Sequence, residues 1–254
     1  MSAPLLEVIA LDAADARHAR DGGADRVELV SDMAAEGLSP SPATVAAVRA
    51  AVDLPVRVMV RTGPGFAAGD LGVLRRTARQ LRAAGAEEFV LGFLDRDGAV
   101  DLPAVLEVLG VLDGAPWTFH RAIDHAADRA AVRAAVAGLP GLDALLTSGA
   151  PAGLAEGLPT ILAEAEAEAE AEAEAEAEAE AEAEAEAGRR IRLLAGGGLR
   201  DEHIGPLRAA GVTAFHSGAA VRPGRSWTDP VDPDLVRRLR TRLTAATAGG
   251  QPAG

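Results

Sequence analysis

Two glutamates stand inside short apolar runs of the sequence, where a charged side chain is uncommon. Glu7 lies in the run 5–9, and Glu28 lies in the run 26–30. A carboxylate is costly to bury without a partner, so two of them in neighbouring runs indicate a functional site. The alternative is a structural ion network in which Arg26 and Arg57 neutralise these charges. For the two arginines we favour this structural role over a functional one, because buried ion pairs that only stabilise a fold are common.

Histidines end two further apolar runs. His120 and His216 can transfer protons near neutral pH or ligate a metal ion. We therefore take Glu7, Glu28, His120 and His216 as candidate catalytic residues, and the same four as candidate metal ligands. We expect Arg61, just after the run 56–60, and Arg121, beside the first histidine, to bind an anion. We expect the remaining histidines to lie at the surface; they are His18, His125 and His203.

Small residues follow three of the later runs. Glycine lets backbone N–H groups approach a ligand closely, and such groups can hold an anion. The sequence predicts that these residues contribute to an anion-binding site; they are Ser148, Gly149, Gly196, Gly197, Gly198 and Ser217. The alternative is that these glycines only form the tight turns that the fold requires.

The elements that must position these residues alternate regularly along the chain. Eight strands are expected at Leu5–Ile9, Arg26–Val30, Pro55–Val60, Glu88–Leu94, Trp117–His120, Ala144–Thr147, Arg192–Ala195 and Ala214–His216. Eight helices are expected at Ala14–Asp21, Pro42–Ala51, Asp70–Ala84, Pro103–Leu112, Arg129–Ala137, Ala155–Ala187, Glu202–Ala210 and Pro233–Ala246. Eight such units predict a single α/β domain, a (β/α)8 barrel of the TIM type over residues 1–250. Its functional residues would lie where the strands end.

Composition excludes several functions. The chain of 254 residues has no cysteine, and all its basic residues are arginine, so thiolate metal sites and lysine Schiff bases are excluded. An alternating Ala/Glu run at 163–187 carries 12 glutamates, and without them the net charge of −13 would be −1. We expect this run to be a solvated, partly helical insert, and residues 247–254 to be a disordered tail. Neither a basic stripe, a membrane span nor a signal peptide is apparent, so we expect no nucleic acid or membrane partner.

Several ordered motifs resemble the CutC family of copper homeostasis proteins. They are Gly23–Leu29, Glu36–Ser41, Gly92–Gly98, Thr118–Asp124, Leu146–Gly149 and His216–Ser217. The resemblance implies a cytoplasmic TIM-type barrel that binds copper and self-associates as a homodimer or higher homo-oligomer. By itself, the candidate ligand set would suit Zn²⁺, Mn²⁺ or Fe²⁺ better than Cu(I), which prefers sulfur ligands.

Three functions stay open at this point. The first is copper handling. The second is an isomerase, epimerase or lyase that acts on a small anionic or phosphorylated substrate, with histidine or glutamate moving the proton. The third is a non-catalytic scaffold that uses the acidic run.

Overall fold

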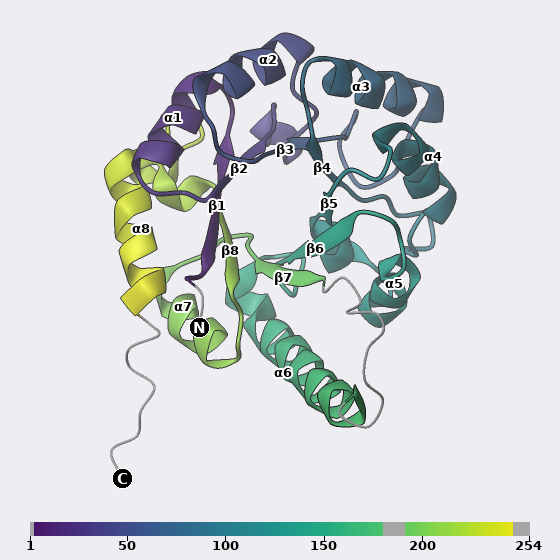
Figure 1. The fold of residues 1–254 in the computed structure, drawn as a ribbon, viewed down its shortest axis with the longest axis vertical. Coiled ribbons are helices and arrows are strands. Elements are labelled where there is room, and N and C mark those ends of the chain that lie inside the picture. Colours follow the sequence, from purple (N-terminus) through teal and green to yellow (C-terminus); the bar gives the residue numbers. More distant parts are fainter. Residues whose placement is uncertain (1–2, 180–190, 246–254) are drawn as a thin grey trace.

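Eight parallel strands close into a barrel in the order β1 to β8, with the helices arranged around it (Figure 1). The structure is a computed structural model that describes residues 3–179 and 191–245. The strands are β1 (Leu5–Ala10), β2 (Arg26–Leu29), β3 (Val56–Met59), β4 (Glu88–Leu91), β5 (Trp117–Phe119), β6 (Leu142–Thr147), β7 (Arg192–Ala195) and β8 (Ala214–Ser217). The expected TIM-type barrel is confirmed.

Capping side chains explain where most helices begin. Asp12, Ser41, Asp70, Asp101 and Asp128 each accept a hydrogen bond from a backbone N–H in the first turn that follows. The helices are α1 (Ala13–Asp21), α2 (Pro42–Ala51), α3 (Leu71–Ala83), α4 (Leu102–Leu112), α5 (Arg129–Val136), α6 (Leu154–Ala179), α7 (Asp201–Ala209) and α8 (Pro233–Ala245). Short 3-10 helices are η1 (Met33–Ala35), η2 (Arg121–His125), η3 (Ala219–Val221) and η4 (Pro223–Arg225).

The strands separate two packing regions. In β3, Val56 and Val58 join the large core between strands and helices, whereas Met59 joins a smaller interior cluster with Ile9 and Val90. Residues alternate in this way because successive strand side chains point to opposite faces. In the interior, the buried side chains of Glu7, Glu28 and His216 lie along β1, β2 and β8. Leu146 of β6 and Leu194 of β7 form an apolar cluster with Ala214.

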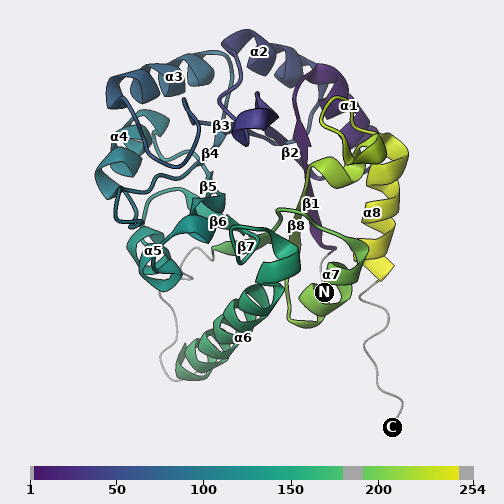
Figure 2. The ribbon, with the colours of Figure 1, turned by 180° about the vertical axis from the view of Figure 1, so that it is seen from behind.

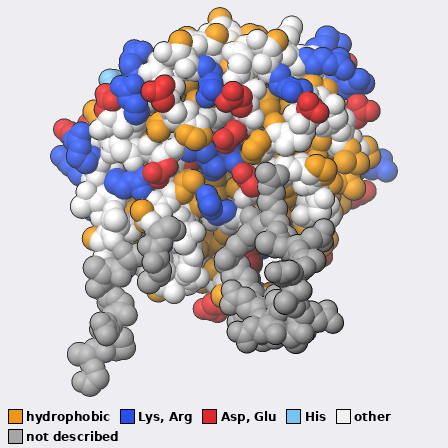
Figure 3. Space-filling view, viewed as in Figure 1, with side chains coloured by type: hydrophobic (Ala, Val, Ile, Leu, Met, Phe, Trp, Pro, Cys, Tyr) orange, Lys and Arg blue, Asp and Glu red, His pale blue; other side chains and the backbone are white. Residues whose placement is uncertain are grey.

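Loops from the carboxyl ends of the strands gather at one end of the barrel. Figure 2 views the molecule from that end, with η1 in front of the ring of strands. The opposite end, in Figure 3, carries interspersed acidic and basic side chains. Among the described residues no helix has both the length and the apolar composition that a membrane span needs.

The fourth strand is shorter than expected. It ends at Leu91, and Leu94 instead forms an isolated antiparallel bridge with Val100. Gly92 begins this loop, and a Cβ there would lie 2.8 Å from Nδ1 of His120. The chain leaves the sheet here, and the missing side chain makes room for that ring.

The Ala/Glu run continues α6 and is not simply solvated where it begins. Ala165 is buried, and Glu164 accepts two hydrogen bonds of 2.9 Å from Arg129. Glu168 pairs with Arg133. The expectation of a free extension is therefore wrong for 163–168, because α5 lies alongside. Residues 180–190 and the expected tail at 247–254 lie outside the described residues.

Candidate functional site

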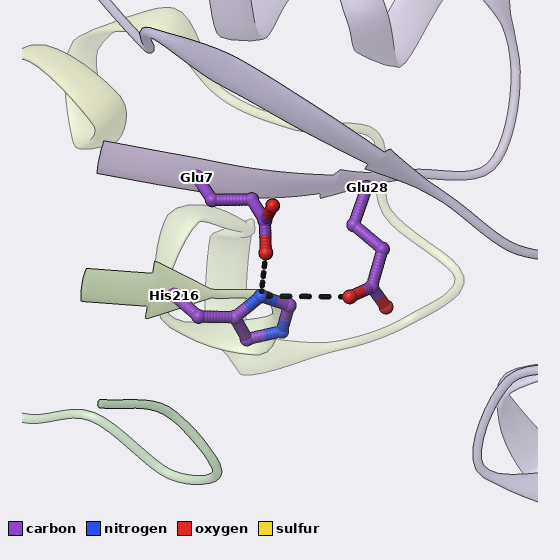
Figure 4. Close-up of side chains that lie close together, drawn as sticks. All are labelled: Glu7, Glu28 and His216. Carbon is purple, nitrogen blue, oxygen red and sulfur yellow. Dashed lines mark hydrogen bonds and ion pairs between the residues drawn. The ribbon is translucent and has the colours of Figure 1, made fainter. Parts of the chain in front are cut away.

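Glu7, Glu28 and His216 project from β1, β2 and β8 into the barrel interior (Figure 4). The strand register places Glu7 beside both His216 and Arg26, although 209 residues separate the glutamate from the histidine. Glu7 Oε1 lies 2.8 Å from His216 Nδ1, and Arg26 Nε donates to Glu7 Oε2 at 2.5 Å. Glu7 is completely buried, so its charge is balanced inside the protein.

Glu28 has weaker partners. Its Oε2 atom lies 3.8 Å from His216 Nδ1, which is beyond hydrogen-bond distance, and no described residue donates a hydrogen bond to this buried oxygen. Burial raises the pKa of Glu28 to about 7, against the attraction of His216. Glu28 can therefore gain or lose a proton near neutral pH.

The pKa values of Glu7 and His216 are shifted as well, the first downward and the second upward. Burial alone would raise the pKa of Glu7, but the charge on Arg26 and the hydrogen bond with His216 outweigh it and lower that pKa to about 2. Burial alone would lower the pKa of His216, yet the carboxylates of Glu28 and Glu7 outweigh it and raise that pKa. One ligand atom from each of these three side chains lies within 4.8 Å of the others, which is compact enough for a metal ion.

A cavity of about 390 Å³ opens beside this group at the carboxyl ends of the strands. It brings together most of the side chains predicted to form the site, although Glu7 lies below it. Predicted residues that line the cavity are Glu28, Arg61, His120, Arg121, Gly197, Gly198, His216 and Ser217. Their roles as catalytic or ligand-binding residues stay predictions.

His120 is held by its neighbours as a neutral ring. Its Nδ1 atom accepts a hydrogen bond of 3.2 Å from the backbone N–H of Ala122, so the ring proton is on Nε2. Burial, together with the positive charge of Arg61, lowers the pKa of His120 to about 3. Within the described part of the chain nothing accepts the buried Nε2–H.

Arg61 is anchored by backbone carbonyls rather than by a carboxylate. Its Nε donates to Gly65 O at 2.9 Å and its Nη1 to Glu36 O at 3.1 Å. The nearest carboxylate oxygen, on Glu36, is 3.9 Å from Nη2. Nη2 is buried and has no hydrogen-bond partner in residues 3–179 or 191–245. Burial lowers the pKa of Arg61, yet an arginine stays charged.

The anion held by Ser148 and Gly149 is the protein's own Asp124. This buried carboxylate accepts hydrogen bonds from both backbone N–H groups, at 2.9 and 3.1 Å, and from the hydroxyls of Thr147 and Ser148. Burial alone would raise the pKa of Asp124, but these hydrogen bonds outweigh it and lower that pKa. Ser148 and Gly149 are therefore not free to bind an external anion, and that prediction is wrong.

Sequence reasoning missed Asp124, although its position three residues after Arg121 was a usable signal. Arg121 Nε donates to Asp124 at 2.9 Å, and its Nη2 donates to Pro151 O at 3.0 Å. Arg121 thus lines the cavity while bracing the loop after β6. Gly197 permits this arrangement, because a Cβ there would lie 2.8 Å from Arg121 Nε.

The remaining small residues predicted to bind an anion differ in whether they line the cavity. Gly196 packs against His216, where a Cβ would meet the side chain at 2.8 Å, and it does not line the cavity. Gly198 faces open space with a φ of +90°. Ser217 lines the cavity with a buried hydroxyl that lacks a partner among the described residues.

Two further expectations need correction. Arg57 forms no ion pair with Glu28, although its charge still favours the ionised form of that carboxyl; it bonds to Glu88 at 3.0 Å and Asp143 at 2.6 Å, and also to Thr118. His203 is buried rather than exposed, and its Nδ1 accepts a hydrogen bond from the Arg200 backbone N–H.

Comparison with known proteins gives consistent matches. The model of the CutC family matches residues 5–171. A family protein CutC of Xanthomonas campestris is 37% identical over 218 residues, covering 84% of this chain and 82% of its own. The copper homeostasis protein cutC homolog of Homo sapiens is 31% identical, covering 85% of this chain and 73% of its own. The crystal structure of a CutC protein from Streptococcus agalactiae shares the fold, with a TM-score of 0.70 at 23% identity, covering 85% and 98% of the two chains.

Proposed function

The chain belongs to the CutC family, and we propose that it serves copper homeostasis by binding a divalent metal ion at Glu7, Glu28 and His216. Copper homeostasis is the function for which its human relative is named. The observation that carries the proposal is the buried group of three ligand atoms within 4.8 Å, in which Glu28 Oε2 has no hydrogen-bond partner in the described chain.

The donor set favours a divalent ion over Cu(I). Imidazole and carboxylate donors suit Cu(II), Zn²⁺, Fe²⁺ or Mn²⁺, whereas Cu(I) prefers thiolate and thioether ligands. Glu28 and His216 would hold the ion, and Glu7 would either ligate it or orient the imidazole. Arg26 holds Glu7 from the other side at 2.5 Å. A bound divalent ion would replace the proton that Glu28 carries below a pKa of about 7.

Titration of metal-free protein with Cu(II), Zn²⁺ and Mn²⁺ tests the proposal. Glu28→Gln should weaken binding of the preferred ion at least tenfold, because it removes the carboxylate charge and keeps the shape. Glu36→Gln is the matched control, since Glu36 also lines the cavity but its side chain is 62% exposed. Affinity in wild-type protein should fall as the pH drops below 7. Equal affinities in the two variants would contradict the proposal.

The family resemblance adds a cytoplasmic location and self-association to the proposal. Light scattering on the full chain after size-exclusion chromatography tests the second of these. A monomer at micromolar concentration would contradict it.

A second candidate, a barrel enzyme acting on a small anionic substrate, is favoured by one specific observation. Nine buried side-chain polar atoms of the described residues lack a hydrogen-bond partner, and four of them belong to residues that line this cavity. They are Glu28 Oε2, Arg61 Nη2, His120 Nε2 and Ser217 Oγ. Buried polar atoms are normally paired, so these four indicate a ligand.

In that function Glu28 or His216 would move a proton, and Arg61 would hold the anion. Mass spectrometry of small molecules that copurify with the protein tests this candidate. We expect a small organic anion in stoichiometric amount. A protein that carries no small molecule, and whose melting midpoint no phosphorylated or carboxylated metabolite raises, would contradict it.

A further inference from the structure

We infer that Arg61 and His120 form a subsite for the carboxylate or phosphoryl group of a small ligand, on the β3–β5 side of the cavity. The inference deepens the second candidate function, on which it rests, and requires no metal.

Arg61 presents one unused donor in a fixed position. Two backbone carbonyls, Gly65 O and Glu36 O, accept from Nε and Nη1, so the guanidinium plane cannot turn freely. Nη2 is then left without an acceptor in the described chain, although the residue is only 4% exposed. Leaving a buried charged donor unpaired is costly, so a site of this kind is built for an acceptor from outside.

His120 presents the second donor. Because the Ala122 backbone N–H occupies Nδ1, the ring proton is on Nε2, and that atom is buried without an acceptor in the part of the chain that the structure describes. The residue is 3% exposed and lines the cavity. A neutral imidazole that donates through Nε2 can polarise a carbonyl or stabilise an oxyanion, and it is not available there as a metal ligand.

Arg61 and His120, which carry the two donors, both pack against the same aromatic side chain, that of Phe66. Phe66 lies 5.0 Å beneath Arg61 Cζ and packs edge-on against His120, with 5.6 Å between ring centroids. All three residues line the cavity. Two hydrogen-bond donors, one of them charged, beside an apolar ring select an oxygen anion and exclude a cation.

The remaining unpaired atoms indicate what the rest of the ligand carries. Glu28 Oε2 accepts and Ser217 Oγ can donate or accept, and both belong to residues on the β2–β8 side of the same cavity. A ligand with an anionic group at Arg61 and His120 and a hydroxyl group toward Glu28 and Ser217 would satisfy all four atoms. A volume of about 390 Å³ suits a small metabolite such as a hydroxy acid or a sugar phosphate.

Calorimetric titration of metal-free full-length protein with two probes, glycolate and inorganic phosphate, tests the inference. The variant is His120→Asn, because the Asn side chain can still accept from the Ala122 N–H but has no donor at the position of Nε2. The matched control is His203→Asn. His203 is also buried and accepts a backbone N–H on Nδ1 at 3.2 Å, but it does not line the cavity.

Wild-type protein should bind at least one probe saturably, and the tighter probe distinguishes a carboxylate site from a phosphoryl site. His120→Asn should weaken that binding about tenfold or more, which is the effect of losing one hydrogen bond to a charged acceptor. His203→Asn should leave it unchanged. His120→Gln, which restores a donor near the position of Nε2, should recover part of the affinity.

Two outcomes would overturn the inference. One is equal affinity of wild type and His120→Asn, and the other is failure of the wild type to bind either probe at millimolar concentration. Either would leave the metal proposal intact, provided that Glu28→Gln still weakens metal binding. The opposite result is also distinguishable. If Glu28→Gln keeps its metal affinity while His120→Asn loses glycolate or phosphate binding, only the metal proposal is contradicted.

Discussion

Glu7 and Glu28 lie on adjacent strands of the same barrel interior, yet the pKa values of the two carboxylates shift in opposite directions. Glu7 has a charged partner on each side, and its pKa falls to about 2. Among the described residues, Glu28 has an ion-pair contact only with His216, at 3.8 Å, and burial raises its pKa to about 7. The first carboxylate therefore stabilises the fold when ionised, and the second destabilises it when ionised.

Glu28→Gln should stabilise the metal-free protein, and more so at high pH. The folded-state pKa of Glu28, about 7, lies above the unfolded value, so wild-type stability falls as the pH rises from about 4.5 to 7. Glutamine removes this loss. The gain in the free energy of unfolding should be on the order of 2 kcal/mol larger at pH 8 than at pH 5. Urea denaturation at the two pH values measures it, and a destabilised variant would show that Glu28 is a structural ion-pair partner.

Glu7→Gln should have the opposite effect. It leaves Arg26 and His216 without their shared carboxylate, and breaking a buried pair costs about 3–5 kcal/mol. The folded-state pKa of Glu7 lies below the unfolded value, so its contribution is present above about pH 4.5 and is lost as the pH falls toward 2. The cost should therefore be nearly equal at pH 5 and pH 8, in contrast to Glu28→Gln. A cost below about 1 kcal/mol in the same denaturation series would contradict this assignment.

At the scale of elements, the loop after β6 depends on a carboxylate from the preceding unit. Asp124 in η2 accepts hydrogen bonds from Thr147, Ser148 and Gly149, and Arg129 at the start of α5 bonds to it at 2.8 Å. Arg129 in turn bonds to Glu164 of α6. This chain of contacts connects the Ala/Glu run to the rim of the cavity.

Only the part of the Ala/Glu run that packs beside α5 should contribute to the stability of the protein. Replacing residues 172–187 with a short Gly/Ser linker should change the free energy of unfolding by less than about 0.5 kcal/mol, as for changes away from packed features. Ala165, Glu168 and Ile191 line one surface hollow, so the chain can rejoin β7 close to the shortened helix. Replacing 165–187 should cost about 1–2 kcal/mol, because buried Ala165 and the Glu168 ion pair are lost. Equal midpoints in thermal denaturation of the two variants would contradict a packed start of the run.

At the scale of the whole molecule, the absence of cysteine limits the copper chemistry. Two methionines, Met33 and Met59, line the cavity, and the chain offers no thiolate anywhere. We therefore expect weak binding of Cu(I), which a competing chelator removes readily, and stronger binding of Cu(II). Anaerobic titration against a Cu(I) chelator measures this. A stoichiometric Cu(I) complex that survives the competition would show that the two thioethers act together as ligands.

The alternation of strands and helices was readable from the sequence by itself. Hydrophobic runs, capping side chains such as Ser41 and the glycines that end helices are local signals, and most element bounds agree to within one or two residues. The alternation of residues within β3 is a signal of the same kind, because Val56 and Val58 join one cluster and Met59 joins the other. The rule that sites lie at the carboxyl ends of barrel strands then placed the cavity.

Only the tertiary structure decided which polar groups are paired and which are free. Strand register brings Glu7 to His216 across 209 residues. It places Arg57 between Glu28 and Glu88, and only the side-chain geometry shows that Arg57 bonds to Glu88 and Asp143 rather than to Glu28. Likewise, nothing in the spacing of Ser148 and Gly149 shows that Asp124 occupies their N–H groups. Hydrogen bonds require alignment to within a few tenths of an ångström, and for residues far apart in the chain that alignment exists only once the barrel has closed.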